Sequence, residues 1–385
     1  MNIAFIAGEY PPLQGGLGDF TRELARALHV IGHTVHVITR QAAGLPRDEV
    51  ADNIQIHRMS PRWNWLSLAQ LSHFISAYHP YVINLQYQTA AYHMHPAIHV
   101  LPLALGRRVP VVVTFHDLRP PYLFPKAGPL RRKAVFELAR SAAVSIVTNI
   151  EDRNTLREQG LSNVAMIPIG SNITRKSLEG FSREAWLRAQ HIPPGTTIVG
   201  YFGFLNASKG GEDLIRALAE LKKQALPVRL LLIGGTHGES DPTNVAYSRE
   251  VMRLAAQLGV SDDITATGYL DERGVTEALT ACDCIALPYR DGVSFRRGTL
   301  MAALSHGCAI VTTEPRIALP EIAHERNMLL VPPADPSALA AAISRVLQDD
   351  SLRNQLRAGS VELSRLFTWN HIAAETLRVY ASLSR

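Results

Sequence analysis

The sequence has few cysteines and no long apolar run. Three cysteines among 385 residues provide no disulfide framework. No apolar segment reaches the roughly 20 residues that a membrane-spanning helix needs. The first residues, Met1–Gly8, carry no basic leader, so they predict a first strand rather than a signal peptide. We therefore expect a cytoplasmic protein.

Recognisable metal ligands are also scarce. The motif Asp-x-Asp does not occur, and no cluster of histidines and carboxylates has metal-binding spacing. Cys282 and Cys284 are closer together than zinc-ligand pairs usually are, and together with Cys308 they predict inert core thiols. His93 and His95 could ligate a metal or contact an acceptor, although a loop without metal is the simpler interpretation. We expect neither a metal nor a cofactor.

Basic residues slightly outnumber acidic ones. The sequence has 39 Lys and Arg against 34 Asp and Glu, a net charge of +5. Most of these charges are expected to be solvated, but Arg131–Lys133 and Lys222–Lys223 could attract an anionic substrate or lipid. This leaves open a weak peripheral contact with the inner face of a membrane. Aromatic residues do not alternate with the basic ones as stacking on nucleic acid would require, so nucleic acid is not an expected partner.

The chain length favours two domains, and the first half alternates strands with helices. Short apolar runs separated by helical stretches predict a parallel sheet covered on both faces. The expected elements are a helix at Phe20–Val30 and strands at Ile3–Ala7, Thr34–Ile38, Val82–Leu85, Val109–Thr114 and Val144–Thr148.

The same alternation restarts after a junction near Ser171–Pro194. Its expected strands are Thr197–Phe202, Arg229–Ile233, Ile264–Thr267, Cys284–Leu287 and Ala309–Thr312. Its expected helices are Gly211–Lys222, Tyr247–Leu258, Gly274–Ala281 and Leu300–Leu304. The sequence thus predicts an α/β fold of two tandem Rossmann-like, doubly wound domains, residues 1–173 and 174–367. Ligands of such sheets bind at the carboxyl ends of the strands.

Several motifs follow these strand ends. Gly15 and Gly16 stand before the first helix, where they permit close approach of a ligand and where free N–H groups attract an anion. Their spacing is not the dinucleotide fingerprint, and a glycine turn without a ligand is the alternative. The other motifs are Val111–Asp117, Tyr201–Gly211, Thr267–Leu270, Pro288–Gly292 and Arg296–Gly307.

Taken in this order, the motifs resemble the retaining glycosyltransferases of the GT-B fold, specifically family 4. The resemblance extends over nearly the whole chain, including Phe367–Trp369. It implies two facing Rossmann-like domains, a nucleotide-sugar donor in the cleft between them, and a terminal helix, residues 368–385, that packs back on the first domain.

The resemblance also implies roles for single residues. Gly15 and Gly16 would lie beside the donor diphosphate, and His116 would be the catalytic residue against the donor sugar. Lys209 would neutralise the leaving diphosphate, and the loop from Gly268 to Leu270 would meet the nucleobase.

The sequence departs from the family pattern at two places. Phe204 stands where an arginine is usual. The usual pair of glutamates is missing, since an ungapped alignment gives Ser294 and Ala302, and a shifted one gives Asp291 and Thr299.

We therefore expect a basic donor site at Ser294–Thr299. A guanidinium of Arg296 or Arg297 could clamp a phosphate, with Ser294, Thr299 and the helix start adding hydrogen bonds. In the alternative interpretation, both arginines are solvated or pair with Asp291.

The predicted function is metal-independent, retaining transfer of a sugar from a nucleotide-diphosphate donor to an unknown glycan, lipid or small-molecule acceptor. One alternative is a nucleotide- or glycan-binding scaffold with impaired catalysis, which the missing glutamates favour. Another is a different GT-B enzyme, such as a nucleotide-sugar epimerase or a phosphorylase, although no cofactor-binding lysine for a phosphorylase is identifiable.

Overall fold

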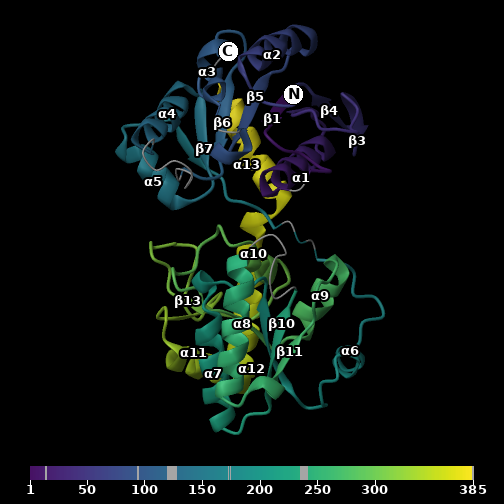
Figure 1. Ribbon diagram of the computed structural model, residues 1–385, viewed down its shortest axis with the longest axis vertical. Helices are drawn as coiled ribbons and strands as arrows, with labels where there is room; N and C mark the ends of the chain where they lie inside the picture. The colour runs from purple at the N-terminus through teal and green to yellow at the C-terminus, as the bar shows by residue number, and fades with distance from the viewer. Residues whose placement is uncertain are drawn as a thin grey trace. The chain divides into compact units, whose positions relative to one another are not determined.

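The chain forms two compact units in a computed structural model, which describes residues 1–13, 15–92, 95–118, 128–171, 173, 175–234 and 242–383 (Figure 1). Unit 1 contains Met1–Asn172 and Leu366–Arg385, and unit 2 contains Ile173–Arg365. The boundaries expected from the sequence, 173/174 and 367/368, differ from these by one and two residues. Within the described ranges, no helix is long and apolar enough to cross a bilayer.

Unit 1 is built on an eight-stranded sheet with the order β3-β4-β2-β1-β5-β6-β7-β8. All neighbouring strands are parallel except β3 and β4, which are antiparallel. The strands are β1 (Asn2–Ala7), β2 (Thr34–Thr39), β3 (Asp48–Ala51), β4 (Ile54–Arg58), β5 (Val82–Tyr87), β6 (Val111–Phe115), β7 (Val144–Val147) and β8 (Val164–Met166).

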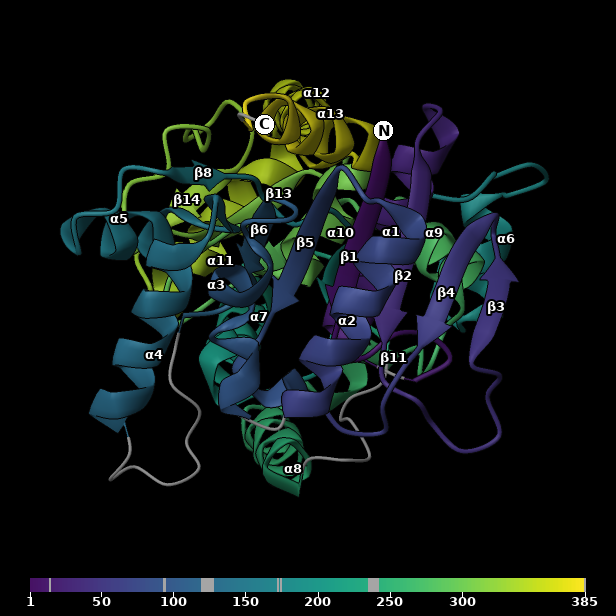
Figure 2. The ribbon, with the colours of Figure 1, turned by 90° about the horizontal axis from the view of Figure 1, so that it is seen from above.

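Helices cover both faces of this sheet because its central strands are apolar on both sides. On β1, Ile3 and Phe5 face one core, and Ala4 and Ile6 face the other. The helices α1 (Gly16–Val30) and α13 (Trp369–Ala381) pack on the first core, and α2 (Trp65–Tyr78) and α3 (Leu101–Leu105) pack on the second (Figure 1 and Figure 2). The second face also carries α4 (Gly128–Ser141) and α5 (Ile150–Glu158).

The terminal helix α13 is part of the core of unit 1. Ile372, Ala373 and Tyr380 are completely buried. The indole N–H of Trp369 donates to the Ser171 carbonyl at 3.0 Å. These contacts attach the end of the chain to the sheet that the first residues begin.

Unit 2 contains a parallel six-stranded sheet with the order β11-β10-β9-β12-β13-β14. Its strands are β9 (Thr197–Phe202), β10 (Val228–Ile233), β11 (Ile264–Ala266), β12 (Cys284–Leu287), β13 (Ile310–Thr313) and β14 (Leu329–Val331). Its helices are α6 (Arg183–Ala189), α7 (Gly211–Lys223), α8 (Pro242–Gln257), α9 (Glu272–Ala281), α10 (Gly298–Ser305), α11 (Pro336–Gln348) and α12 (Asp350–Ser364).

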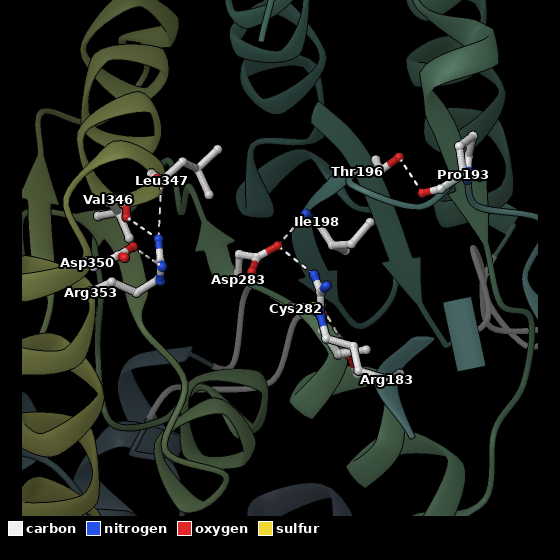
Figure 3. Close-up of polar contacts among 12 residues, drawn as sticks. Arg183, Pro193, Thr196, Ile198, Cys282, Asp283, Val346, Leu347, Asp350 and Arg353 are labelled. Carbon is white, nitrogen blue, oxygen red and sulfur yellow. Dashed lines mark hydrogen bonds and ion pairs between the residues drawn. The ribbon is translucent and has the colours of Figure 1, made fainter. Parts of the chain in front are cut away.

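An acidic side chain ties the first helix of unit 2 to this sheet. Asp283, directly before β12, accepts hydrogen bonds from the Ile198 N–H at 2.7 Å and from Arg183 of α6 at 2.8 Å (Figure 3). Arg183 also donates to the Ala281 carbonyl at 2.8 Å. This anchor lies at the amino ends of β9 and β12 and leaves their carboxyl ends for other residues.

The two parallel α/β units confirm the predicted fold class. Each predicted strand lies within two residues of an observed one. The three cysteines are free and buried, as expected for core thiols, and burial raises the pKa of each.

Candidate functional site

A lysine and a threonine meet at the carboxyl end of β9. Lys209 ends the short helix η4 (Ala207–Lys209), which follows this strand. Gly203, directly after β9, has a φ of 105°, a region that larger residues rarely adopt. A methyl group at Gly203 would lie 3.5 Å from Nζ of Lys209 and 2.6 Å from Cγ2 of Thr299. The missing side chain thus lets both residues approach the same strand end.

A guanidinium is fixed beside this lysine. Arg297 lies 4.8 Å over the buried ring of Tyr289 and forms an ion pair with Asp291. The Tyr289 hydroxyl bonds Oγ1 of Thr299 at 2.6 Å. Burial lowers the pKa of Lys209, and the positive charge of Arg297 lowers it further. Two positive charges are therefore close enough to repel each other, which an anion between them would relieve.

Helix α10 begins at the same place. Arg297 is its N-cap, and the Arg297 side chain makes no capping hydrogen bond. Gly298, the first helical residue, is exposed, and nothing approaches the position of a Cβ there. The first N–H groups of a helix lack intrahelical partners and attract anions. The start of α10 thus offers backbone donors next to two cationic side chains.

Arg290 lies in the predicted motif Pro288–Gly292 but was given no role, and it connects two segments of the candidate site. Arg290 pairs with Glu212 at 2.9 Å and with Asp213 at 2.8 Å, both in the first turn of α7. Its backbone N–H donates to the Ser208 carbonyl at 2.9 Å. Gly210 has a φ of 69°, and a Cβ there would collide with the Pro288 carbonyl oxygen. The segment that carries Lys209 is therefore fixed against the end of β12.

The loop after β11 lies beside the end of β10. Gly268, at a φ of 69°, forms an isolated bridge with Gly234, whose N–H donates to Oγ1 of Thr267 at 3.1 Å. Tyr269 is 89% exposed, so its ring is open to a ligand, whereas Leu270 is half-buried. Gly268 and Leu270 thus lie at the carboxyl edge of the sheet.

In unit 1, His116 follows β6 at the carboxyl edge of the sheet. Its Nε2 is 2.8 Å from Oε1 of Gln86, and its ring lies edge-on to Phe20 of α1, with 4.7 Å between centroids. Its backbone N–H donates to the Tyr87 carbonyl at 3.0 Å. Burial lowers the pKa of His116 to about 4, so the imidazole is neutral at physiological pH.

The glycines at the start of α1 lie against an acidic residue. A Cβ at Gly15 would collide with the carboxylate of Glu9, and nothing approaches the corresponding position at Gly16. Gly15 is the N-cap of α1, and its side-chain-free backbone makes room for this carboxylate. The structure therefore places an anionic group beside the glycine pair.

His95 has a local structural role. Its Nδ1 accepts a hydrogen bond from the Ala97 N–H at 3.2 Å, and its ring contacts Trp65. His93 lies outside the described residues. In the part of the chain that the structure describes, no three His, Cys, Asp or Glu side chains are grouped as a metal site would require.

The structure brings Lys209, Arg297 and Thr299 together, with Ser294 and Arg296 half-buried in the segment just before α10. At the positions of the family's missing residues, Phe204 is 43% exposed and Ala302 is completely buried. The candidate site also includes residues that lie in the predicted motifs but had no predicted role, namely Gly203, Gly210, Tyr289 and Arg290. Their signal in the sequence is their position directly after strand ends.

Two family models match most of the chain. The first, described as glycosyl transferase 4-like domain, matches residues 15–170. The second, described as glycosyl transferases group 1, matches residues 196–349. The two matches fall on unit 1 and unit 2, respectively.

Similar proteins agree with these matches. The D-inositol 3-phosphate glycosyltransferase of Xylanimonas cellulosilytica is 27% identical over 96% of this chain and 92% of its own length. Among solved structures, sucrose-phosphate synthase from Thermosynechococcus elongatus is 23% identical with a TM-score of 0.71, covering 99% of this chain and 98% of the other. HepE from Anabaena, in complex with UDP, is 19% identical with a TM-score of 0.74, covering 100% of both chains.

Proposed function

The chain belongs to the group 1, family 4 glycosyltransferases of the GT-B fold, and we propose that it transfers a sugar from a nucleoside-diphosphate donor with retention at the anomeric carbon. In this reaction the bond from the anomeric carbon to the diphosphate oxygen breaks, and its electron pair leaves with the diphosphate. The acceptor oxygen bonds to the anomeric carbon from the same side, and its proton passes to the departing diphosphate oxygen.

The observation that carries the proposal is the cationic site around Gly203. Lys209, Arg297 and the start of α10 lie together in unit 2. Charge grows on the leaving diphosphate as the anomeric bond breaks, so fixed positive groups and backbone donors stabilise the transition state more than the bound donor. Because Lys209, Arg297 and the backbone N–H groups can stabilise this charge without a metal ion, we propose metal-independent transfer.

Gly15, Gly16 and His116 remain candidates from unit 1. We propose that the glycine pair contributes to diphosphate binding, for which the Glu9 carboxylate beside Gly15 must move aside, and that the imidazole of His116 contacts the donor sugar. The neutral imidazole offers a directed hydrogen bond without adding a further positive charge to those of Lys209 and Arg297. Gly268 and Leu270 are proposed to meet the nucleobase.

Two comparisons suggest the first compounds to test. The structure of HepE holds UDP, which supports a uridine nucleotide as donor. The Xylanimonas relative is named for D-inositol 3-phosphate, which supports a phosphorylated sugar or polyol as acceptor.

A binding scaffold with impaired catalysis is the second candidate. Ser294 and the buried Ala302 occupy the positions of the usual glutamates, so the contacts that these carboxylates would make with the donor are missing. Such a scaffold would bind a nucleoside diphosphate without turning over its sugar conjugate.

The test is release of UDP from UDP-sugars, with and without D-inositol 3-phosphate and other phosphorylated polyols. We expect release in the presence of a chelator, and we expect His116→Ala to lower turnover more than UDP affinity. Turnover that needs added magnesium or manganese would exclude metal independence. UDP binding without any release would favour the scaffold.

A further inference from the structure

A chain of buried polar side chains connects the terminal helix to His116. Asn84 and Gln86 of β5, Thr114 of β6 and Tyr380 of α13 are all at most 3% exposed. Strand residues 84 and 86 point to the same face of the sheet, the face that α1 and α13 cover. Four polar side chains in one apolar core must satisfy one another, because unpaired buried polar groups are costly.

Each hydrogen bond in this series of buried polar side chains has a defined donor and acceptor. The Asn84 amide N–H donates to the Tyr380 hydroxyl oxygen at 2.7 Å. The Asn84 carbonyl oxygen accepts from Thr114 at 2.9 Å and from the Gln86 amide at 3.0 Å. With its amide N–H used in this way, Gln86 presents its carbonyl oxygen to His116.

This direction determines which ring nitrogen of His116 carries the proton. Oε1 of Gln86 is an acceptor only, so Nε2 of His116, 2.8 Å away, must donate. A neutral imidazole has one N–H, so Nδ1 then carries a lone pair. Among the described residues, no hydrogen bond of His116 uses Nδ1.

We infer that the chain Tyr380–Asn84–Gln86 fixes His116 in the Nε2–H tautomer, so that Nδ1 accepts a hydrogen bond from a hydroxyl group of the donor sugar. The inference rests on the proposed function only for its last step, the identity of the ligand. Gln86, Asn84 and Tyr380 are positioning residues, because they act through His116. Burial supports the same picture, since it lowers the pKa of His116 and keeps the ring neutral.

The experiment is nitrogen NMR of the full-length protein labelled at histidine, combined with turnover of the UDP-sugar. In the wild type, the His116 signals should show a protonated Nε2 and an unprotonated Nδ1 at neutral pH. Gln86→Leu should allow both tautomers and lower kcat roughly tenfold, about what one lost hydrogen bond of moderate strength is worth. UDP affinity should stay unchanged, because Gln86 does not contact the proposed diphosphate site.

Two further variants separate positioning from general loss of stability. Tyr380→Phe removes the far end of the chain and should shift the tautomer ratio in the same direction by a smaller amount. Ser145→Ala is the control. Ser145 of β7 is equally buried, but its hydroxyl donates a hydrogen bond to the Ala139 carbonyl and is not part of the hydrogen-bonded series that leads to His116. This variant should leave both the tautomer and kcat unchanged.

The outcomes distinguish this inference from the proposed function. A wild-type Nδ1–H tautomer, or an unchanged tautomer and kcat in Gln86→Leu, would overturn the inference while transfer activity persists. A protein that turns over no nucleotide sugar would contradict the proposed function, and the tautomer measurement would still decide whether the chain fixes the ring.

Discussion

At the scale of single residues, the site in unit 2 depends on two cations that face one strand end. Lys209 is half-buried, and Arg297 is held over Tyr289, so neither needs to be ordered when a ligand binds. A cation that is already ordered and partly dehydrated forms a stronger hydrogen bond to a phosphate than a flexible surface lysine does.

We predict that Lys209→Ala and Arg297→Ala each weaken UDP binding by about 2–5 kcal/mol, the range for truncating one partner of a desolvated charge pair. Lys222→Ala is the matched control, because Lys222 is a half-buried lysine of α7 that pairs with Asp263 at 2.8 Å, away from the end of β9. Titration calorimetry measures the three affinities. If only the control weakens binding, the diphosphate site lies elsewhere.

Asp291 is the residue that competes with the ligand for Arg297. Its carboxylate, which is 54% exposed, pairs with a guanidinium that is 20% exposed. This is the pairing that the alternative interpretation of the sequence gave. A diphosphate that takes the same guanidinium must displace the carboxylate.

We predict that Asp291→Asn strengthens UDP binding about fivefold, because the amide keeps the size of the side chain but no longer neutralises Arg297. In an Arg297→Ala background, the same substitution should have no effect, which a double-mutant cycle of affinities measures. Equal gains in both backgrounds would show that Asp291 acts through the general charge of the site and not through Arg297.

At the scale of helices and strands, a buried histidine pair links β2 to β4. Nδ1 of His36 lies 3.0 Å from Nε2 of His57, and Nδ1 of His57 lies 2.8 Å from Asp48 of β3. Both rings pack against Phe74 and Tyr78 of α2. Burial, with a smaller contribution from His57, lowers the pKa of His36 to about 4.

This shift predicts a loss of stability in acid. The ordinary pKa of histidine is near 6.5, so between pH 6.5 and 4 the unfolded chain binds a proton that folded His36 does not. The free energy of unfolding should therefore fall as the pH falls, by about 2 kcal/mol at about pH 5 for this one residue.

Hydrogen exchange of the amides of β2 and α2 at about pH 7 and pH 5 measures this effect. His36→Gln should flatten the dependence, and His79→Gln should not, because His79 is exposed at the end of α2. An undiminished slope in His36→Gln would assign the proton uptake to another group.

The sequence predicted strongly apolar elements well and short ones poorly. All ten expected strands exist, but β3, β4, β8 and β14 were not predicted. β3, Asp48–Ala51, has exposed or half-buried residues throughout, and β8 and β14, although apolar, have only three residues each, which is too few to show a periodicity. Such strands form because a neighbouring strand supplies their hydrogen bonds, which is a tertiary property.

The site residues were predictable from the sequence only where a local motif marks them. Lys209 and Arg297 were predicted from motifs at strand and helix ends, and the structure places them close together near the end of β9. Tyr289 and Arg290 were given no role, because Tyr289 contacts Thr299, 10 positions away, and Arg290 contacts Asp213 in the acidic start of α7, 77 positions away. The polar chain to His116 joins residues 296 positions apart, Asn84 and Tyr380, which no local pattern can indicate.

At the scale of the whole molecule, the chain has a net charge of +5, and the charged residues of unit 1 are distributed unevenly over its surface. The surface formed by α2, α3 with the residues after it, and α4 carries one acidic residue, Glu137, against the basic residues Arg107, Arg108, Arg131, Arg132, Lys133 and Arg140. The opposite face is balanced, since α1 and α13 together carry three acidic and three basic residues, Asp19, Glu23 and Glu375 against Arg22, Arg26 and Arg378.

The same surface exposes large apolar side chains. Leu66 of α2, Leu103 of α3 and Leu130 of α4 are 72%, 70% and 73% exposed. Arg108 joins α3 to α2 through Ser76 at 2.6 Å, so these helices form one continuous layer. Basic and apolar side chains on one layer suit the headgroups and the upper acyl region of an anionic bilayer, and we therefore propose this surface for the peripheral membrane contact expected from Arg131–Lys133.

We predict that the protein sediments with vesicles containing about 30% phosphatidylglycerol and not with pure phosphatidylcholine, and that about 0.5 M salt releases it. Replacing Arg131, Arg132 and Lys133 by alanine should lower the partition coefficient roughly a hundredfold, since each basic residue near an anionic surface is worth about a factor of five. Leu66→Ser with Leu103→Ser should also weaken binding, whereas Val30→Ser on α1, where Val30 is 79% exposed, should not. If the charge variant releases the protein but the leucine variant does not, the surface binds polyanions in general and a bilayer is not its specific partner.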